Sequence, residues 1–91
     1  MTRALVITTT AGWTFVGVEA PTIDGHLRLI EAKNVRMFGT AGGASSLAGN
    51  GPTRTTVLDH YGTVSVNPLE TKEVLEARTA SWLKIFPSLH S

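Results

Sequence analysis

The glycine-rich segment 39–52 is the part of the sequence best suited to bind a small ligand. It holds five glycines, and consecutive backbone N–H groups in a glycine-rich turn can form a nest for an anion. Flanking cationic side chains would add positive charge to such a nest. The candidate ligand-binding residues are Lys33, Arg36, Gly42, Gly43 and Arg54. The segment lacks both the G-x-x-x-x-G-K-[ST] and the G-x-G-x-x-G spacing, so the alternative interpretation is a flexible connector.

The histidines do not form a metal-ligand pattern. The three are His26, His60 and His90, far apart and without carboxylates at ligand spacing, so no metal site is predicted. Only His60 has a neighbouring acid, Asp59, in the group 59–61 that ends with Tyr61. Successive residues of a strand point to opposite faces, so Asp59 and His60 would not meet at one substrate. A polar turn is the preferred interpretation of this segment.

No other catalytic set stands out. The carboxylates of Glu70, Glu73 and Glu76 are spaced as on one face of a helix, which is typical of a solvated surface. The many threonines lie in strand-like contexts, where threonine is favoured for structural reasons. We therefore predict a protein that is not an enzyme and requires no cofactor.

The large aromatic residues are predicted to form the core. They are Trp13, Phe15, Phe38, Trp82 and Phe86. A single-stranded nucleic-acid site would instead need exposed rings among Lys and Arg side chains. The eight Lys and Arg residues are scattered and the net charge is only +1, which argues against nucleic acid.

The elements that position these residues are mainly strands. We predict a small, partly closed antiparallel β-barrel of SH3-like or Sm-like size with a short C-terminal helix. Residues 3–10 and 13–19 form a hairpin, and the Asp24-Gly25 pair marks a second hairpin turn. Neither face of 13–19 is strongly polar, so both faces are expected to be covered.

Two interruptions in strand alternation are interpreted as barrel corners. Leu27 and Leu29 alternate in one phase and Val35 and Met37 in another, which predicts a bulge or sharp bend between them. A comparable break at 67–72 separates the apolar residues at 64–66 from those at 74–75. Bent strands of this kind curl a short sheet toward closure.

Helical segments are expected to be short. Within 39–52 the glycine density allows at most one turn, capped by Ser45 and covering 46–48. At the C-terminus Thr79 is expected to cap a helix over 79–86, with Trp82 and Phe86 at helical spacing, before Pro87 stops it. This helix would cover one end of the barrel.

Length and composition predict one soluble domain over residues 1–91. The chain is 42% hydrophobic and 16% charged, which is typical of a globular protein. A core of this size gives modest stability, and without cysteine there are no disulfides or cysteine-bound zinc to add to it. We therefore expect a homo-oligomer. No signal peptide or membrane-spanning stretch is apparent, so a cytoplasmic location is expected.

Five short motifs follow one another along the chain: Val6-Ile7-Thr8-Thr9, Phe15-Val16-Gly17, Ala32-Lys33-Asn34, Gly51-Pro52 and Trp82. In this order they resemble a family of small bacteriophage-encoded proteins with no assigned chemistry. That family opens with a Val-Val-Thr-Thr strand, followed by a Phe-x-Gly strand, an Ala-Arg-Asn bend, a Gly-rich segment ending in Gly-Pro and an aromatic helix. The segments 39–50 and 59–61 depart from this pattern. The resemblance implies a phage accessory protein in the cytoplasm of a bacterial host.

Three functions remain open at this point. The first is a non-catalytic, homo-oligomeric phage accessory protein that binds a host or anti-phage defence component. The second is a sponge or sensor for a small anionic ligand such as a nucleotide, held by the Gly-rich segment. The third is binding of single-stranded nucleic acid.

Overall fold

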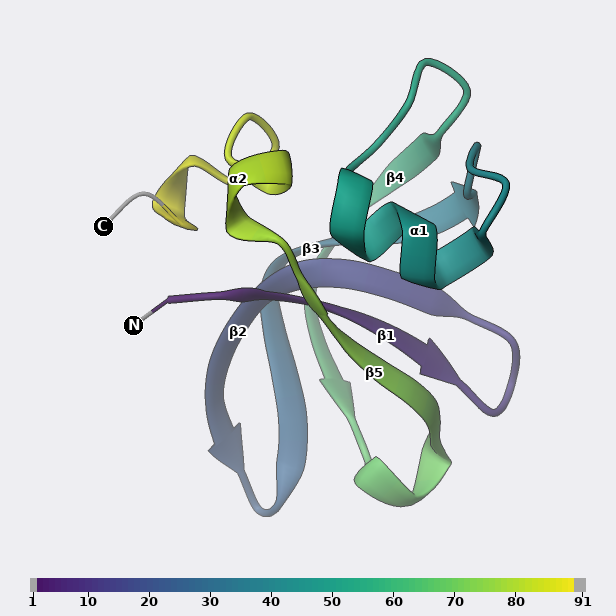
Figure 1. The fold of residues 1–91 in the computed structure, drawn as a ribbon. Helices are drawn as coiled ribbons and strands as arrows, with labels where there is room; N and C mark the ends of the chain where they lie inside the picture. Colours follow the sequence, from purple (N-terminus) through teal and green to yellow (C-terminus); the bar gives the residue numbers. More distant parts are fainter. Residues whose placement is uncertain (1, 90–91) are drawn as a thin grey trace.

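The computed structural model describes residues 2–89, which form one curled antiparallel sheet with helices packed on one of its faces (Figure 1). The strands are β1 (Ala4–Thr9), β2 (Thr14–Ile23), β3 (His26–Met37), β4 (Val57–Val66) and β5 (Thr71–Ala77). The helical elements are α1 (Gly43–Asn50), the 3-10 helix η1 (Pro68–Glu70), α2 (Thr79–Trp82) and the 3-10 helix η2 (Pro87–Leu89). The strand order is β4-β3-β2-β1-β5. The predicted mainly β fold with a short C-terminal helix is confirmed, but the sheet is not closed, because β4 and β5 form its two edges.

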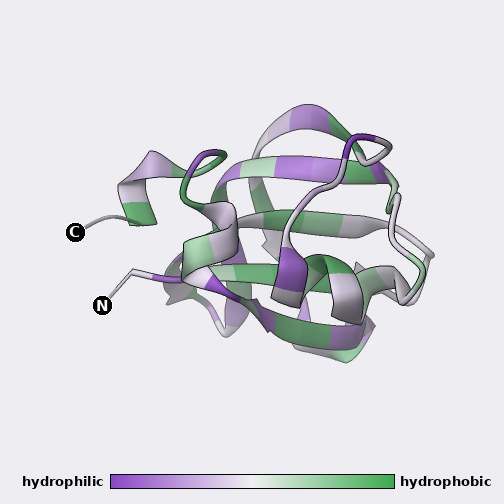
Figure 2. Ribbon diagram, turned by 45° about the horizontal axis from the view of Figure 1, so that its top comes forward, coloured by the Kyte–Doolittle hydropathy of each residue, from purple (hydrophilic) through white to green (hydrophobic). Residues whose placement is uncertain are grey.

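Both faces of β1 and β2 are buried, as their sequences predict. Leu5, Ile7 and Phe15 belong to one core cluster with residues of β3 and β4. Val6 and Val16 belong to a second cluster on the opposite face, together with residues of α1 and the C-terminal segment. Figure 2 shows hydrophobic segments along these central strands. One sheet therefore supports two cores, and each forms on a different face of the same strands.

The predicted bend in β3 is confirmed and lies at Glu31. The register passes from Val16 opposite Lys33 to Val18 opposite Ile30, which leaves an extra residue on β3. Glu31 has a φ of +53°, a left-handed conformation that is uncommon outside glycine. The preceding turn also follows the prediction: Asp24 and Gly25 both have positive φ, +53° and +77°, as a two-residue type I′ hairpin turn requires.

The second predicted corner has a different role. The interruption after Val66 is η1, and it joins two different strands rather than bending one. Because β4 and β5 are opposite edges, this connection carries the chain from one edge of the sheet to the other. Asn67 starts it as a helix cap, its side-chain Oδ1 accepting from the Leu69 N–H at 2.9 Å.

The prediction that 39–52 is a glycine-rich loop with at most one helical turn is wrong. Helix α1 has eight residues, starts after Gly42 and places Leu47 and Ala48 in the core. Glycine lowers helix propensity, but tertiary packing of an apolar face outweighs propensity in most protein helices. Here the C-terminal segment also binds the end of the helix: the Arg78 N–H and the Trp82 Nε1–H both donate to the Ala48 carbonyl, at 2.9 and 3.2 Å.

The C-terminal helix is shorter than the predicted 79–86. Regular α-helix ends at Trp82, and one further helical turn places the Phe86 N–H 2.9 Å from the Trp82 carbonyl. Arg78, not Thr79, occupies the capping position, and no side chain caps the helix. The predicted apolar spacing nevertheless holds, because Trp82 and Phe86 are fully buried with ring centroids 5.9 Å apart. With α1, this segment covers one face of the sheet. No described helix is long and apolar enough to cross a membrane.

One charged cluster joins three strands at the opposite end of β1 from the β1–β2 turn. Arg3 Nε donates to Glu19 Oε1 at 2.6 Å, Arg3 Nη2 donates to Glu19 Oε2 at 3.2 Å, and Arg3 Nη1 lies 3.3 Å from Glu76 Oε2. The hydrogen bond from Arg3 lowers the pKa of the Glu19 carboxyl below its usual value, and burial opposes this shift. The ionised form of Glu19 is thus the form that the fold stabilises.

We expect Gly51→Ala to destabilise the fold by about 2 kcal/mol or more. Gly51 has a φ of +81°, and a Cβ there would lie 2.5 Å from the Ser81 carbonyl oxygen. Gly49→Ala is the matched control, since a Cβ at Gly49 meets nothing within 4 Å and alanine favours helix by about 0.5–1 kcal/mol. Urea unfolding of both variants checks this. Equal stability of the two would contradict the tight packing of α1 against the C-terminal segment.

We expect Glu19→Gln to weaken the dependence of stability on acidic pH. Because the pKa of Glu19 is lowered in the folded state, its stabilising contribution is present above the ordinary glutamate pKa and is lost as pH falls through the folded value. Chemical unfolding between pH 7 and pH 3 should therefore show a shallower loss of the free energy of unfolding in this variant. Glu73→Gln, an exposed change outside the cluster, should follow the wild type.

Candidate functional site

The five sequence-predicted ligand residues lie at separate places. Lys33 lies on β3 and lines a pocket of about 180 Å³ with Glu31, His60, Ile85 and Phe86, under the C-terminal segment. Gly42 and Gly43 lie at the first turn of α1, the end of that helix farther from the C-terminal segment. The chain thus places Lys33 and the two glycines at different ends of the helical layer.

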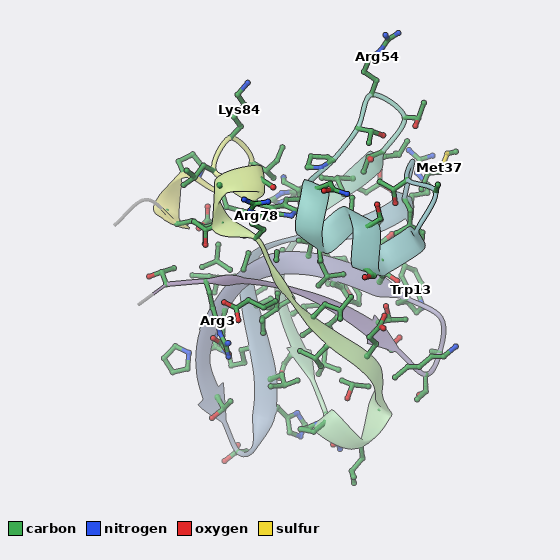
Figure 3. The ribbon with its side chains drawn as sticks, viewed as in Figure 1. Arg3, Trp13, Met37, Arg54, Arg78 and Lys84 are labelled. Atoms are coloured by element: carbon green, nitrogen blue, oxygen red, sulfur yellow. The ribbon has the colours of Figure 1, made fainter. Side chains whose placement is uncertain are left out.

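Arg36 and Arg54 do not lie together with the other three residues at one site either. Arg36 Nε lies 3.0 Å from Asp59 Oδ2, so its charge is paired across β3 and β4. Arg54 lies at the tip of the turn between α1 and β4, and its side chain extends into solvent (Figure 3). At the base of that turn the Thr53 and Thr55 hydroxyls donate to the Gly39 carbonyl. The Thr56 hydroxyl donates to the Phe38 carbonyl. A ligand-binding role for these five residues stays a prediction.

The segment 59–61 is strand rather than the predicted polar turn. All three residues belong to β4. Gly62 follows them with a φ of +110° and pairs with Ala32 of β3, and the register between the two strands shifts on both sides of this pair. Asp59 pairs with Arg36, whereas His60 lines the small pocket beside Lys33. The two side chains therefore have different neighbours. His90 lies outside the described residues, and within those residues no group of three His, Asp or Glu side chains could hold a metal ion.

An aromatic pocket of about 290 Å³ lies between the end of β1, the start of β2 and the edge strand β4. Its lining residues are Thr9, Thr10, Ala11, Trp13, Phe15, Tyr61, Val64, Ser65, Val66, Asn67 and Glu70. They come from the β1–β2 turn, β4 and the connection that crosses from β4 to β5. The pocket thus lies where the curled sheet remains open.

Three aromatic rings define the pocket. Phe15 is buried and lies at its base, while Trp13 is 54% exposed and Tyr61 is 53% exposed. The Trp13 and Phe15 rings are nearly parallel, with an angle of 9° and centroids 6.2 Å apart. The Tyr61 ring meets Phe15 edge-on, with centroids 4.9 Å apart. Two exposed rings therefore pack against a buried one.

Local hydrogen bonds hold the walls of the pocket. The Thr9 hydroxyl accepts from the Trp13 N–H at 3.1 Å, which ties the β1–β2 turn. The Thr10 N–H donates to the Glu70 carbonyl at 2.8 Å, which joins this turn to η1. The Glu70 N–H donates to the Asn67 carbonyl, also at 2.8 Å. The rim is therefore held by hydrogen bonds from the backbone and from one threonine hydroxyl.

The arrangement is suited to binding. Exposed faces of tryptophan and tyrosine attract flat groups and cations, and a pocket of this size holds one such group. Glu70 is the one charged residue among those that line it. No histidine, lysine or arginine lines the pocket beside that carboxylate to act with it in proton transfer.

The aromatic prediction was correct for Phe15, Trp82 and Phe86 and wrong for Trp13. Phe38 is partly buried against the second cluster. Trp13 shares the face of Phe15, as alternation predicts, but it precedes the first residue of β2 and follows the turn at Gly12. A large ring at the end of a strand has fewer neighbours to cover it, and this is the signal in the sequence that pointed to exposure. Tyr61 had no comparable signal, because its partner ring comes from a distant strand.

No family model matches the sequence, and no curated protein matches it at a significant level.

Proposed function

We propose that this protein is a non-catalytic binding protein and that the aromatic pocket is its binding site. The observation that carries the proposal is the pair of exposed rings, Trp13 and Tyr61, which both pack against buried Phe15. Leaving two large rings more than half exposed forgoes the stabilisation that their burial would supply. Exposed aromatic clusters around a concavity are typical of recognition sites.

The occupant is a flat group belonging to a larger partner. The pocket is too small for a whole partner, but it accommodates one planar group stacked on Trp13. The resemblance to small bacteriophage proteins supports a partner that is a host or defence component, met in the bacterial cytoplasm. Such a role requires recognition and no chemistry.

The alternatives have less support from the geometry. Single-stranded nucleic acid requires exposed rings, which are present, and also nearby cations, but the one charge on the pocket lining is the carboxylate of Glu70. An anionic ligand at the Gly-rich segment would have to compete with Asp59 for Arg36.

We expect flat probe molecules to bind at Trp13. In a two-dimensional NMR spectrum the two indole N–H signals serve as paired reporters, because Trp13 is exposed and Trp82 is fully buried. A panel of N-acetyltryptophan amide, adenosine and N-acetylarginine amide should include at least one probe that shifts the Trp13 signal and leaves that of Trp82 in place.

Trp13→Ala should remove this binding. Because the variant has no indole at position 13, the loss of binding is measured as loss of the shifts at neighbouring backbone amides. Met37→Ala is the matched control, because Met37 is 56% exposed, does not line the pocket, and projects from the end of β3 (Figure 3). Absence of any shift at Trp13 across the panel would contradict the proposed function.

We further propose that the protein is a homo-oligomer. Both edge strands, β4 and β5, have one side without a strand partner in the described sheet, and such edges readily pair with another chain. Light scattering of the purified chain should therefore give the mass of two or more chains, each of 9.7 kDa. A mass equal to one chain at all concentrations tested would refute the oligomer and leave the binding pocket unaffected.

A further inference from the structure

We propose that the aromatic pocket receives the guanidinium group of an arginine side chain presented by a partner protein. This inference rests on the proposed function of the same pocket and names the chemistry of its occupant. It is carried by three features: the carboxylate on the rim, the exposed rings, and an exposed apolar residue next to that carboxylate in the chain.

The rim carries one negatively charged residue, Glu70, whose backbone is held in place. Glu70 has its backbone N–H bonded to the Asn67 carbonyl and its carbonyl bonded to the Thr10 N–H, both at 2.8 Å. Among the described residues, no hydrogen bond or ion pair engages its carboxylate. An unpaired carboxylate on the lining of a pocket with exposed rings attracts a cation and repels an anion.

The cationic residues around the site leave this charge uncompensated. Arg36 is paired with Asp59, and Arg28, on the strand next to β4, lies 3.5 Å from the Pro21 carbonyl. Lys72 is two residues beyond Glu70, where the pairing of β5 with β1 shifts by one residue, and it does not line the pocket. The pocket therefore presents one carboxylate and no cation on its lining.

The rings favour a flat cation over a compact one. A guanidinium stacks its plane on an aromatic face and can at the same time donate two parallel hydrogen bonds to a carboxylate. Tryptophan is the best aromatic partner for a cation, and the exposed ring nearest the turn is Trp13. An ammonium has no plane to stack, and a quaternary ammonium has no N–H to donate to Glu70.

The surroundings favour an arginine that belongs to a protein. Leu69, adjacent to Glu70, is 89% exposed and offers apolar contact outside the pocket. The residues on either side of an arginine in a peptide offer apolar side chains for this contact, and a free small guanidinium has none. The proposed partner therefore presents arginine within an apolar stretch.

The test compares peptides that differ only in their central side chain. The probe is acetyl-Gly-Leu-Arg-Leu-Gly-amide, and its counterparts carry lysine or citrulline at the centre, citrulline being the neutral analogue of arginine. Dissociation constants are measured from the Trp13 indole signal. We expect the arginine peptide to bind about tenfold more tightly than the citrulline peptide, because only arginine adds charge-assisted hydrogen bonds. Its affinity should also exceed that of the lysine peptide and that of free N-acetylarginine amide.

The variants locate the effect. Glu70→Gln should make the arginine and citrulline peptides bind equally, whereas Glu73→Gln, an exposed change on β5 outside the pocket, should preserve the tenfold difference. Leu69→Ala should weaken binding of the arginine peptide and leave the affinity for free N-acetylarginine amide unchanged.

Three outcomes would overturn the inference. Equal binding of the arginine and citrulline peptides to the wild type would reject a cationic occupant, while a shift of Trp13 by neutral probes would keep the proposed function intact. Equal binding of the peptide and free N-acetylarginine amide would reject a partner protein as the source. No response of Trp13 to any probe would reject both the inference and the proposed function.

Discussion

Strands β1 and β2 carry apolar side chains on both faces, so the chain has to cover both faces of the same sheet at once. The bend of β3 at Glu31 allows this, because it folds the β3–β4 end of the sheet over Leu5, Ile7 and Phe15. Gly17 lies opposite this bend, where a Cβ would come within 3.0 Å of Ala32 and Leu29. The other face is left for α1 and the C-terminal segment, and the two cores depend on this division.

The same bend decides where the aromatic pocket lies. The sheet curls but does not close, so β4 stands apart from the β1–β2 turn and the aromatic pocket opens between them. The crossing from β4 to β5 then places Glu70 on the rim and binds it to Thr10 through the backbone. The proposed site is therefore a consequence of incomplete closure of the sheet.

The helical layer shows how far packing can override local preference. Segment 39–52 has a composition that disfavours helix, yet α1 forms because Leu47 and Ala48 are buried and because Trp82 donates to the Ala48 carbonyl. Gly51, which looks like part of a flexible run in the sequence, ends this helix where the Ser81 backbone approaches too closely for any side chain. Composition alone predicted a connector, whereas contacts from residues thirty positions away made a helix.

Local patterns in the sequence by themselves determined the first three strands, the Asp24-Gly25 turn, the bend in β3 and the spacing of Trp82 and Phe86, because each depends on alternation, turn chemistry or helical period within a few residues. Strand β4 was predicted only in part, since its segment 59–61 was interpreted as a polar turn. The tertiary structure alone decided the length of α1 and the pairing of Arg36 with Asp59. It also decided the meeting of Phe15, Tyr61 and Glu70 at one pocket. These residues are separated by up to 55 positions in the sequence, so no local pattern links them, and only the curl of the sheet and the crossing connection bring them together.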